Sequence, residues 1–155
     1  MKILVSAYIR GISLLENFLG PIILLYARYT IGIIFLNSGW MKFENFLIGE
    51  WANTVFLFEE VHPVPHIPPE LAAAFGTWAE IIFSVLLIAG MFTRVSAIAI
   101  IFIILVMNLT PLIANDPESL ETHSYWILVL SLFVAKGAGF LSIDHLYVKW
   151  KSKKS

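Results

Sequence analysis

The sequence contains no cysteine. This absence excludes disulfides, thiol–disulfide exchange, iron–sulfur ligation and cysteine-based zinc sites within the chain. Charged residues are also scarce, at 14% of 155 residues, whereas a soluble domain carries about a quarter. The shortage of charge and the positive mean hydropathy indicate a membrane protein.

Several chemical motifs are missing too. The sequence has no glycine-rich phosphate loop, nucleophile triad or nucleotide fingerprint, so neither a nucleotide cofactor nor nucleic-acid binding is expected. His62 and His66 have a spacing that binds metal on a helix, but Pro63 and Pro65 exclude a helix there. We therefore expect these two histidines to be exposed loop residues, and we expect no metal site.

The sequence contains long apolar runs. A helix of roughly twenty apolar residues crosses a bilayer, and four runs approach that length, at residues 21–40, 71–90, 95–114 and 125–140. Exposed backbone is not tolerated in lipid, so runs this apolar must be helical. The expected fold is an all-α membrane protein, an up-down bundle of four transmembrane helices that forms a single domain over residues 1–155.

The charges predict how this bundle is oriented. Eight of the ten basic residues fall on the side of both termini and the second loop, and most acids fall on the other side. Because lysine and arginine favour the cytoplasmic side, both termini should be cytoplasmic. Residues 1–20 and 141–155 are expected to be interfacial segments on the inner surface, although the first could instead extend the first membrane helix.

The first outer loop is long and has two parts. "GEWANTVFLFEE" mixes aromatic and acidic residues in a pattern typical of a short amphipathic helix on the outer surface. "VHPVPHIPPE" follows, and its four prolines favour extended structure, with Pro68 and Pro69 suited to the start of the second membrane helix. The loop should therefore either lie on the outer surface or form a lid over the outer end of the bundle.

The first run carries a buried charge. Arg28, Gly32, Phe35, Gly39 and Lys42 recur at spacings of four and three, so they share one helix face. Glycines on that face let another helix approach closely. The second run carries a single acid, Glu80, and charges in hydrocarbon are costly unless they are paired. We predict an ion pair between Arg28 and Glu80, which either fixes the helix register or lines a ligand cavity.

Polar groups also gather near the outer ends of the runs. His123 opens the fourth run and is expected to approach Lys42, Asn37 and Ser38 on the first run. Asn108 on the third run, with Trp40, Trp51 and Trp78, could complete a polar site under an aromatic lid. Histidine and lysine there could hydrogen-bond the carbonyl groups of a flat molecule such as a quinone and deliver protons. The same residues could equally be ordinary polar and aromatic groups at helix ends.

Four segments in order resemble the DoxX family of small bacterial and archaeal membrane proteins. They are "ARYTIG", "NSGWMKF", "GTWAEIIFSVLLIAGMFTR" and "KGAGFLSID", and they extend from Ala27 to Asp144. The resemblance implies a four-helix bundle in a cell membrane and a loose association with redox chemistry, since relatives include a thiosulfate:quinone oxidoreductase subunit. The missing cysteines argue against thiol-based forms of that chemistry.

Two functions remain open. In the first, the chain is a membrane subunit of a redox system, such as a quinone-linked oxidoreductase. Its catalytic groups would be His123 and Lys42. Its ligand-binding groups would be Arg28, Glu80, Asn37, Ser38, Trp78 and Asn108. It would work with a membrane or envelope partner that carries the electron-transfer cofactor. In the second, the chain is an assembly or scaffold subunit of an envelope complex, without chemistry of its own.

Overall fold

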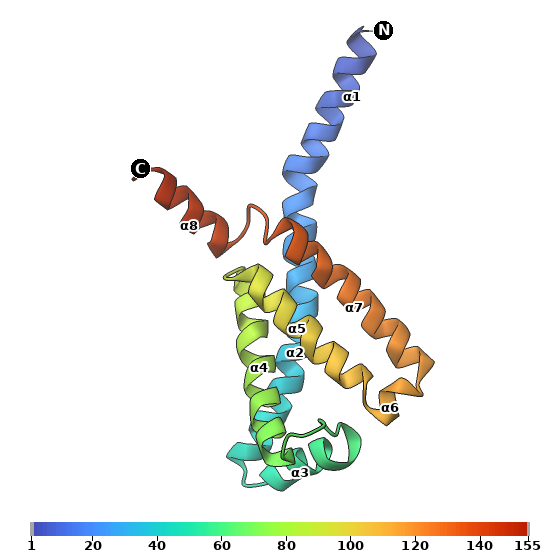
Figure 1. The fold of residues 1–155 in the computed structure, drawn as a ribbon. Helices are drawn as coiled ribbons and strands as arrows, with labels where there is room; N and C mark the ends of the chain where they lie inside the picture. Colours follow the sequence, from blue (N-terminus) through green and yellow to red (C-terminus); the bar gives the residue numbers. More distant parts are fainter. Residues whose placement is uncertain (1, 155) are drawn as a thin grey trace.

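The structure is a computed structural model that describes residues 2–154, and this part of the chain is helical without any strand. Its elements are α1 (Lys2–Leu14), η1 (Leu15–Leu19), α2 (Gly20–Leu47), α3 (Trp51–Phe56), η2 (Leu57–Val61), α4 (Pro69–Ala89), α5 (Thr93–Asn108), α6 (Pro111–Ala114), α7 (Pro117–Lys136) and α8 (Ile143–Ser152). The two η segments are π-helical turns. Figure 1 shows the whole arrangement.

The N-terminal segment extends the first membrane helix. α1, η1 and α2 follow one another without a break, and in Figure 1 they form one long rod that projects beyond the other helices. Pro21 lacks an N–H and would interrupt the regular hydrogen-bond ladder. The π-turn directly before it changes the pattern, with the Gly20 N–H bonded to the Leu15 carbonyl, and the helix continues. The N-terminal segment is therefore an extension of the first membrane helix and not a separate interfacial segment.

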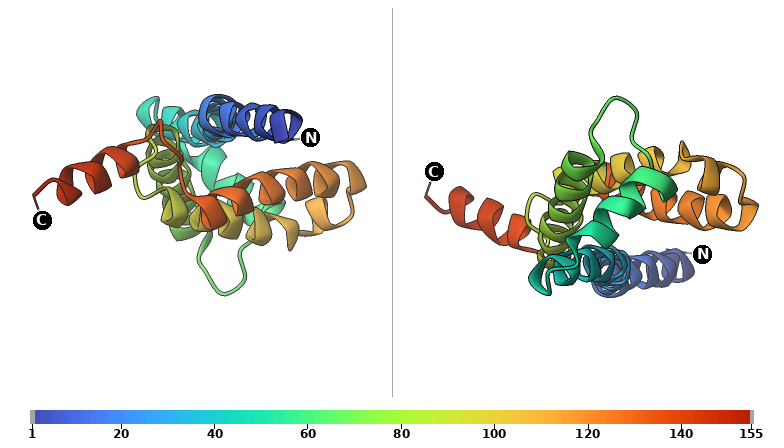
Figure 2. Two further views of the ribbon diagram at one scale, coloured as in Figure 1. Left: turned by 90° about the horizontal axis from the view of Figure 1, so that it is seen from above. Right: turned by 90° about the horizontal axis from the view of Figure 1, so that it is seen from below.

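The long helices pack in chain order. α2 contacts α4, α4 contacts α5, and α5 contacts α7, each pair being antiparallel (Figure 1). Seen along the bundle, α4 lies at one flank, where it adjoins both α2 and the start of α5, and α7 lies farther from it (Figure 2). The core lies where these helices meet. It consists of Ile31, Phe35, Leu87, Ala97, Ile100, Ile104, Leu130 and Phe133.

The face predicted on α2 is buried against α4. A side chain added at Gly39 would lie 3.0 Å from Glu80 Cβ, and one added at Gly32 would lie 2.4 Å from an Ile88 carbon. Both glycines are therefore needed for this close approach. They also set the antiparallel register, because each one fixes which part of α4 lies opposite.

The expected Arg28–Glu80 ion pair is wrong. In this register Lys42 lies beside Glu80, and Arg28 lies at the other end of α4, beside Gly90. The Arg28 guanidinium donates through Nη2 to the Leu141 carbonyl at 2.5 Å. The prediction assumed that the start of the first apolar run and the end of the second lie at the same depth in the membrane. In the structure, the end of α4 lies level with Arg28 instead.

Two of the four apolar runs differ from the expected helices. The run 95–114 is not one helix, because α5 ends at Asn108 and Pro111 starts the short α6 after a turn. The fourth helix begins earlier than expected, at Pro117, where Asp116 accepts a hydrogen bond from the Glu118 N–H. It ends at Lys136, before Gly137 with φ +76°.

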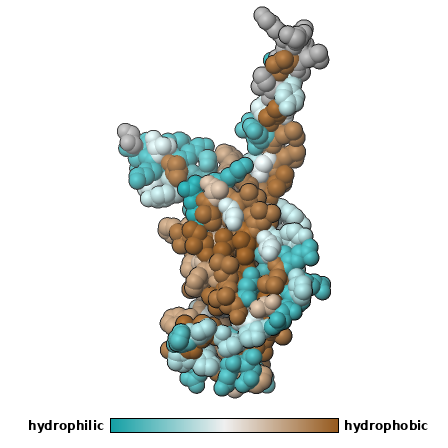
Figure 3. Space-filling view, turned by 45° about the vertical axis from the view of Figure 1, so that its right-hand side comes forward, coloured by the Kyte–Doolittle hydropathy of each residue, from teal (hydrophilic) through white to brown (hydrophobic). Residues whose placement is uncertain are grey.

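Two helices are long and apolar enough to cross a membrane, Arg10–Leu47 and Pro69–Ala89, and α5 is a shorter apolar helix. Only 22% and 33% of their most apolar windows are buried inside the protein, whereas the core helix of a soluble protein is mostly buried. Figure 3 shows hydrophobic side chains over the middle of the visible face, with hydrophilic ones gathered below and over α8. Such a belt suits a bilayer.

The first loop forms a lid over one end of the bundle. α3 and η2 form consecutive helical turns, and α4 begins at Pro69 as expected. The lid is fastened to α2 by Thr54, which is 1% exposed. Its hydroxyl donates to the Lys42 carbonyl at 3.4 Å and accepts from the Asn45 amide at 3.1 Å.

At the opposite end of the bundle, the first turn of α8 contacts the α4–α5 turn, and the rest of α8 projects to the side (Figure 1). Ser142 caps α8, accepting from the His145 N–H at 3.2 Å. Asp144 accepts from the N–H groups of Phe92 and Thr93 at 2.9 and 3.0 Å. These bonds satisfy the start of α5 and connect α8 to the α4–α5 turn.

Gly90 provides a test of this end of the bundle. It has φ +69°, and an added Cβ would meet Arg28 Nη1 at 1.7 Å; Gly49 has φ +83° and nothing within 4 Å. Gly49→Ala should cost about 1–2 kcal/mol for the left-handed backbone alone. Gly90→Ala should cost about 1–3 kcal/mol more, because it also displaces a buried arginine. Thermal unfolding in detergent measures both, and equal losses would show that Arg28 is not held against Gly90.

Candidate functional site

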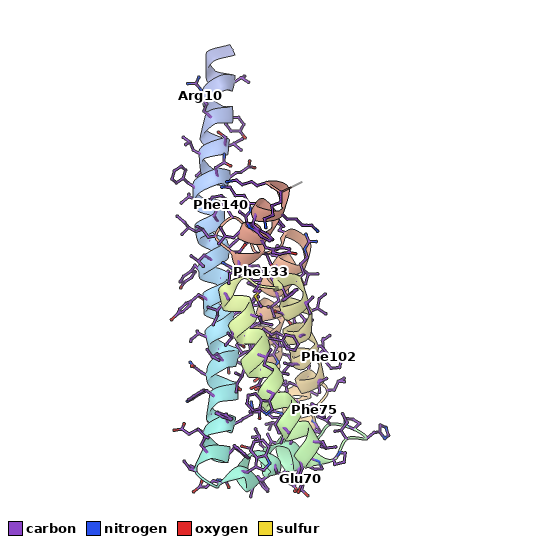
Figure 4. All side chains as sticks on the ribbon, turned by 90° about the vertical axis from the view of Figure 1, so that its left-hand side faces the viewer. Arg10, Glu70, Phe75, Phe102, Phe133 and Phe140 are labelled. Carbon is purple, nitrogen blue, oxygen red and sulfur yellow. The ribbon has the colours of Figure 1, made fainter. Side chains whose placement is uncertain are left out.

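The main candidate site is an apolar cavity of about 450 Å³ in the half of the bundle that carries the lid. α4 and α5 diverge from their tight turn (Figure 1), and the cavity occupies the space between them, with α2 behind it and η2 and the proline-rich loop over it. Phe75 and Phe102, labelled in Figure 4, both line it and are 71% and 66% exposed. The cavity therefore reaches the apolar flank of the bundle between these two rings.

A buried ion pair lines this cavity. Lys42 Nζ lies 2.6 Å from Glu80 Oε2, and the two residues are 6% and 4% exposed. The same ammonium donates to the Ser38 hydroxyl at 2.8 Å. An ammonium carries three N–H donors. Two are used here, so one remains for a molecule in the cavity.

The lid contributes a second polar group. His62 follows η2 and lines the cavity, with its Nδ1 lying 3.4 Å from the Thr110 hydroxyl, which also lines it. Phe58 on η2 packs over Gly76 of α4, where an added Cβ would lie 2.7 Å from the ring. The lid thus rests directly on α4 through an aromatic contact.

The environment of His62 disfavours its charged form. Burial lowers the pKa of His62 below its ordinary value of 6.5, and the nearby positive charges of Lys42 and His123 lower it further. At neutral pH the imidazole is therefore neutral, and it offers one donor and one acceptor nitrogen.

The predicted site residues separate into groups. Lys42, Glu80 and Ser38 lie together on the cavity. His123 and Asn108 lie together elsewhere, between α5 and α7, with His123 Nδ1 2.5 Å from Asn108 Oδ1. The His123 ring also packs on Trp126, which meets Phe35 edge-on.

Three other predicted residues lie away from the cavity. Asn37 and Trp78 are exposed on the outer surfaces of their helices, and Trp78 packs against Phe43. Arg28 lies at the far end of the bundle. Among residues 2–154, no three histidine, aspartate or glutamate side chains are grouped as metal ligands.

The sequence interpretation missed His62, Thr110 and Phe58. His62 was expected to be an exposed loop residue because Pro63 and Pro65 exclude a helix there, but it is partly buried beside Thr110, between α5 and α6. The sequence did contain a signal for this position. His62 directly follows an amphipathic segment, and the apolar side of that segment must face the bundle. Thr110 lies before the helix-breaking Pro111, which turns its hydroxyl side into the cavity wall.

An all-helical chain with these long, largely exposed apolar helices is a membrane protein. Comparison with family models supplies the family: the DoxX model matches residues 23–111, which is more than half of the chain. The chain belongs to the DoxX family. The matched region contains α4, α5, the lid and nearly all of α2, and it ends before α7 and α8. Comparisons with curated proteins and with solved structures gave no match.

A double-mutant cycle tests the ion pair. Lys42→Met and Glu80→Gln should each lower the free energy of unfolding by about 3–5 kcal/mol, because each leaves a buried polar partner unpaired. The double variant should lose much less than the sum. The matched cycle with Arg28→Met and Glu80→Gln should be additive within about 0.5 kcal/mol, since those residues do not touch. Chemical unfolding in detergent gives all the values, and coupling only in the second cycle would contradict this geometry.

The lowered pKa of His62 predicts a pH dependence. Folding favours the neutral imidazole, so the stabilising contribution is fully present above the unfolded pKa near 6.5 and is lost as the pH falls below it. The melting temperature should therefore decrease between pH 7 and 5, and His62→Gln should reduce that decrease. His66→Gln, at an exposed loop position, is the control. An unchanged pH profile in His62→Gln would assign the effect to other groups.

Proposed function

We propose that the chain crosses a cell membrane of a bacterium or archaeon with four spans. α2 and α4 are the two full-length spans, α5 with α6 is the third, and α7 is the fourth. The arrangement in Figure 1 supports this, because the four elements run antiparallel and their connections fall alternately at the two ends. Helices that bond their own backbone groups are the only open elements that hydrocarbon tolerates.

In this proposal both termini are cytoplasmic. The end of the bundle that carries them also carries Arg94, Lys136 and the lysines of α8, while Glu50, Glu59 and Glu60 lie around the lid at the other end. The excess of lysine and arginine is the feature that orients membrane helices. The cavity with Lys42 and Glu80 then lies in the outer half of the membrane.

We propose further that this cavity binds a quinone or a similar flat, lipid-soluble molecule. The observation that carries the proposal is the buried Lys42–Glu80 pair on the wall of an otherwise apolar cavity. Ionisable groups inside a membrane are costly and mark functional sites. A merely structural pair would not need a cavity beside it.

The residues fit such a molecule in size and chemistry. A volume of about 450 Å³ lies within the usual range for small-molecule sites. The spare N–H of Lys42 and the neutral imidazole of His62 could each hydrogen-bond a carbonyl oxygen, while Phe75, Phe102 and Met107 offer an apolar surface to the ring. The flank between Phe75 and Phe102 would admit a molecule dissolved in the lipid.

Each residue has a definite task in this site. Glu80 and Ser38 accept hydrogen bonds from the Lys42 ammonium and hold it in place, which leaves its third N–H for the ligand. His62, neutral and close to the outer surface, would accept or release a proton at an imidazole nitrogen. A bound quinone supplies redox chemistry. Because the chain has no cysteine, a thiolate-bound electron carrier would belong to a partner protein.

A second function is that of an assembly or scaffold subunit. α1 supports it, because this helix projects beyond the bundle (Figure 1) and, together with η1, carries exposed apolar residues such as Tyr8, Leu14 and Phe18. A helix of this kind could contact another membrane or envelope protein. In this case the cavity would be structural, and the chain would have no chemistry of its own.

Purification in mild detergent separates the two functions. Quinone extracted from the wild-type protein should approach one molecule per chain. Ala79→Phe fills the cavity while Lys42 and Glu80 are both kept, and it should lower that content about tenfold or more, as expected when a ligand loses its space. Ile82→Phe, at an exposed position on the same helix, should leave it unchanged. A stoichiometric partner chain with no quinone would instead support the scaffold function.

A further inference from the structure

A second cavity lies at the end of the bundle that carries the termini, away from the site described above. Its volume is about 680 Å³, and it lies between the start of α5, the end of α7 and the start of α8. Much of its wall is backbone, at Gly137, Ala138 and Gly139, and both glycines have positive φ. The cavity is open, so a group from the surroundings can enter it.

The wall of this cavity is positively charged. Arg94 and Lys136 line it and are exposed. Arg28 lies directly behind the wall, because its guanidinium and the Ser142 side chain crowd the same face of Gly90. Among the lining residues, the acid is Asp144, and both of its carboxylate oxygens already accept hydrogen bonds from the start of α5.

Two buried residues here have polar atoms without a hydrogen-bond partner. One is Thr93, which lines the cavity and is 1% exposed, through its hydroxyl. The other is Arg28, through its Nε and Nη1 atoms. Buried polar groups in proteins are almost always satisfied, so an unpartnered donor on a cavity wall indicates a partner that enters the cavity. A molecule that binds here must accept hydrogen bonds and be compatible with the positive charge of the cavity wall.

The rim of the cavity is apolar. Phe92, Val95, Phe140 and Val148 all line it and are more than half exposed. Figure 4 labels Phe140 near the end of the bundle from which α1 and Arg10 extend. A soluble anion would make no use of this rim, whereas a molecule with both an anionic group and hydrocarbon would contact both parts.

We infer that this cavity is a binding site for an acidic phospholipid, with the phosphate between Arg94, Lys136 and Thr93 and the glycerol and acyl region against the apolar rim. α8 suits such a position, because Lys149 and Lys151 accompany exposed Tyr147 and Trp150 along it. Basic and aromatic residues together are typical of helices at a membrane surface. The lipid would connect α5, α7 and α8 at their meeting point.

Native mass spectrometry of the full chain tests this inference. The detergent-purified protein is mixed with equal amounts of phosphatidylglycerol and phosphatidylcholine, and the bound lipids are counted. The wild type should favour phosphatidylglycerol by about tenfold or more, the attraction expected from two basic groups near an anionic phosphate. Arg94→Gln with Lys136→Gln should remove the preference. Thr93→Val, which keeps the shape and removes the hydroxyl, should reduce it several-fold.

The matched control is Lys153→Gln with Lys154→Gln, which removes the same charge beyond α8 and outside the cavity. It should keep the preference within about twofold. An equal loss in this control would overturn the inference in favour of diffuse attraction by the tail. Displacement of the lipid by excess inorganic phosphate would overturn it in favour of a soluble phosphorylated anion. If the variant with Arg94→Gln and Lys136→Gln does not fold, Thr93→Val provides the test. An unchanged preference for phosphatidylglycerol in Thr93→Val would overturn the inference.

Discussion

The antiparallel contact between α2 and α4 determines where the polar groups of this protein lie. Gly32 and Gly39 allow the helices to approach until side chains of α4 touch the α2 backbone, and so fix the register. In that register Lys42 meets Glu80, and Arg28 meets the open face of Gly90. One packing arrangement thus places a neutralised pair at one end of the interface and a buried cation at the other.

The two buried cations are stabilised in different ways. Lys42 has a carboxylate and a hydroxyl within hydrogen-bond distance, so its charge is compensated locally. Arg28 has a backbone carbonyl, with Asp144 further away as its source of negative charge. Around Lys42, one N–H of the ammonium is left without a partner. Around Arg28, two donor nitrogens are left without partners, and this difference underlies the two separate sites inferred for the molecule.

The helical fold and its buried faces could be predicted from the sequence, because spacings of three and four residues identify a face without any knowledge of its partner. The pairing of Glu80 could not, since it depends on the relative depth of two helices, and the ends of apolar runs give depth too coarsely. The third run contains Pro111, which interrupts the helix, but the residues around it are apolar, so the run was interpreted as one continuous helix. The position of His62 depended on how the lid folds back, which local composition does not determine.

The long-range bond between Arg28 and Leu141 has a consequence for biosynthesis. The two residues are 113 positions apart, so the guanidinium enters the membrane well before its carbonyl acceptor has been translated. Until the last segment arrives, water, lipid phosphate or the insertion machinery must solvate that cation. A chain that ended before Leu141 would keep an unsatisfied buried arginine, so the last segment completes the assembly of the bundle.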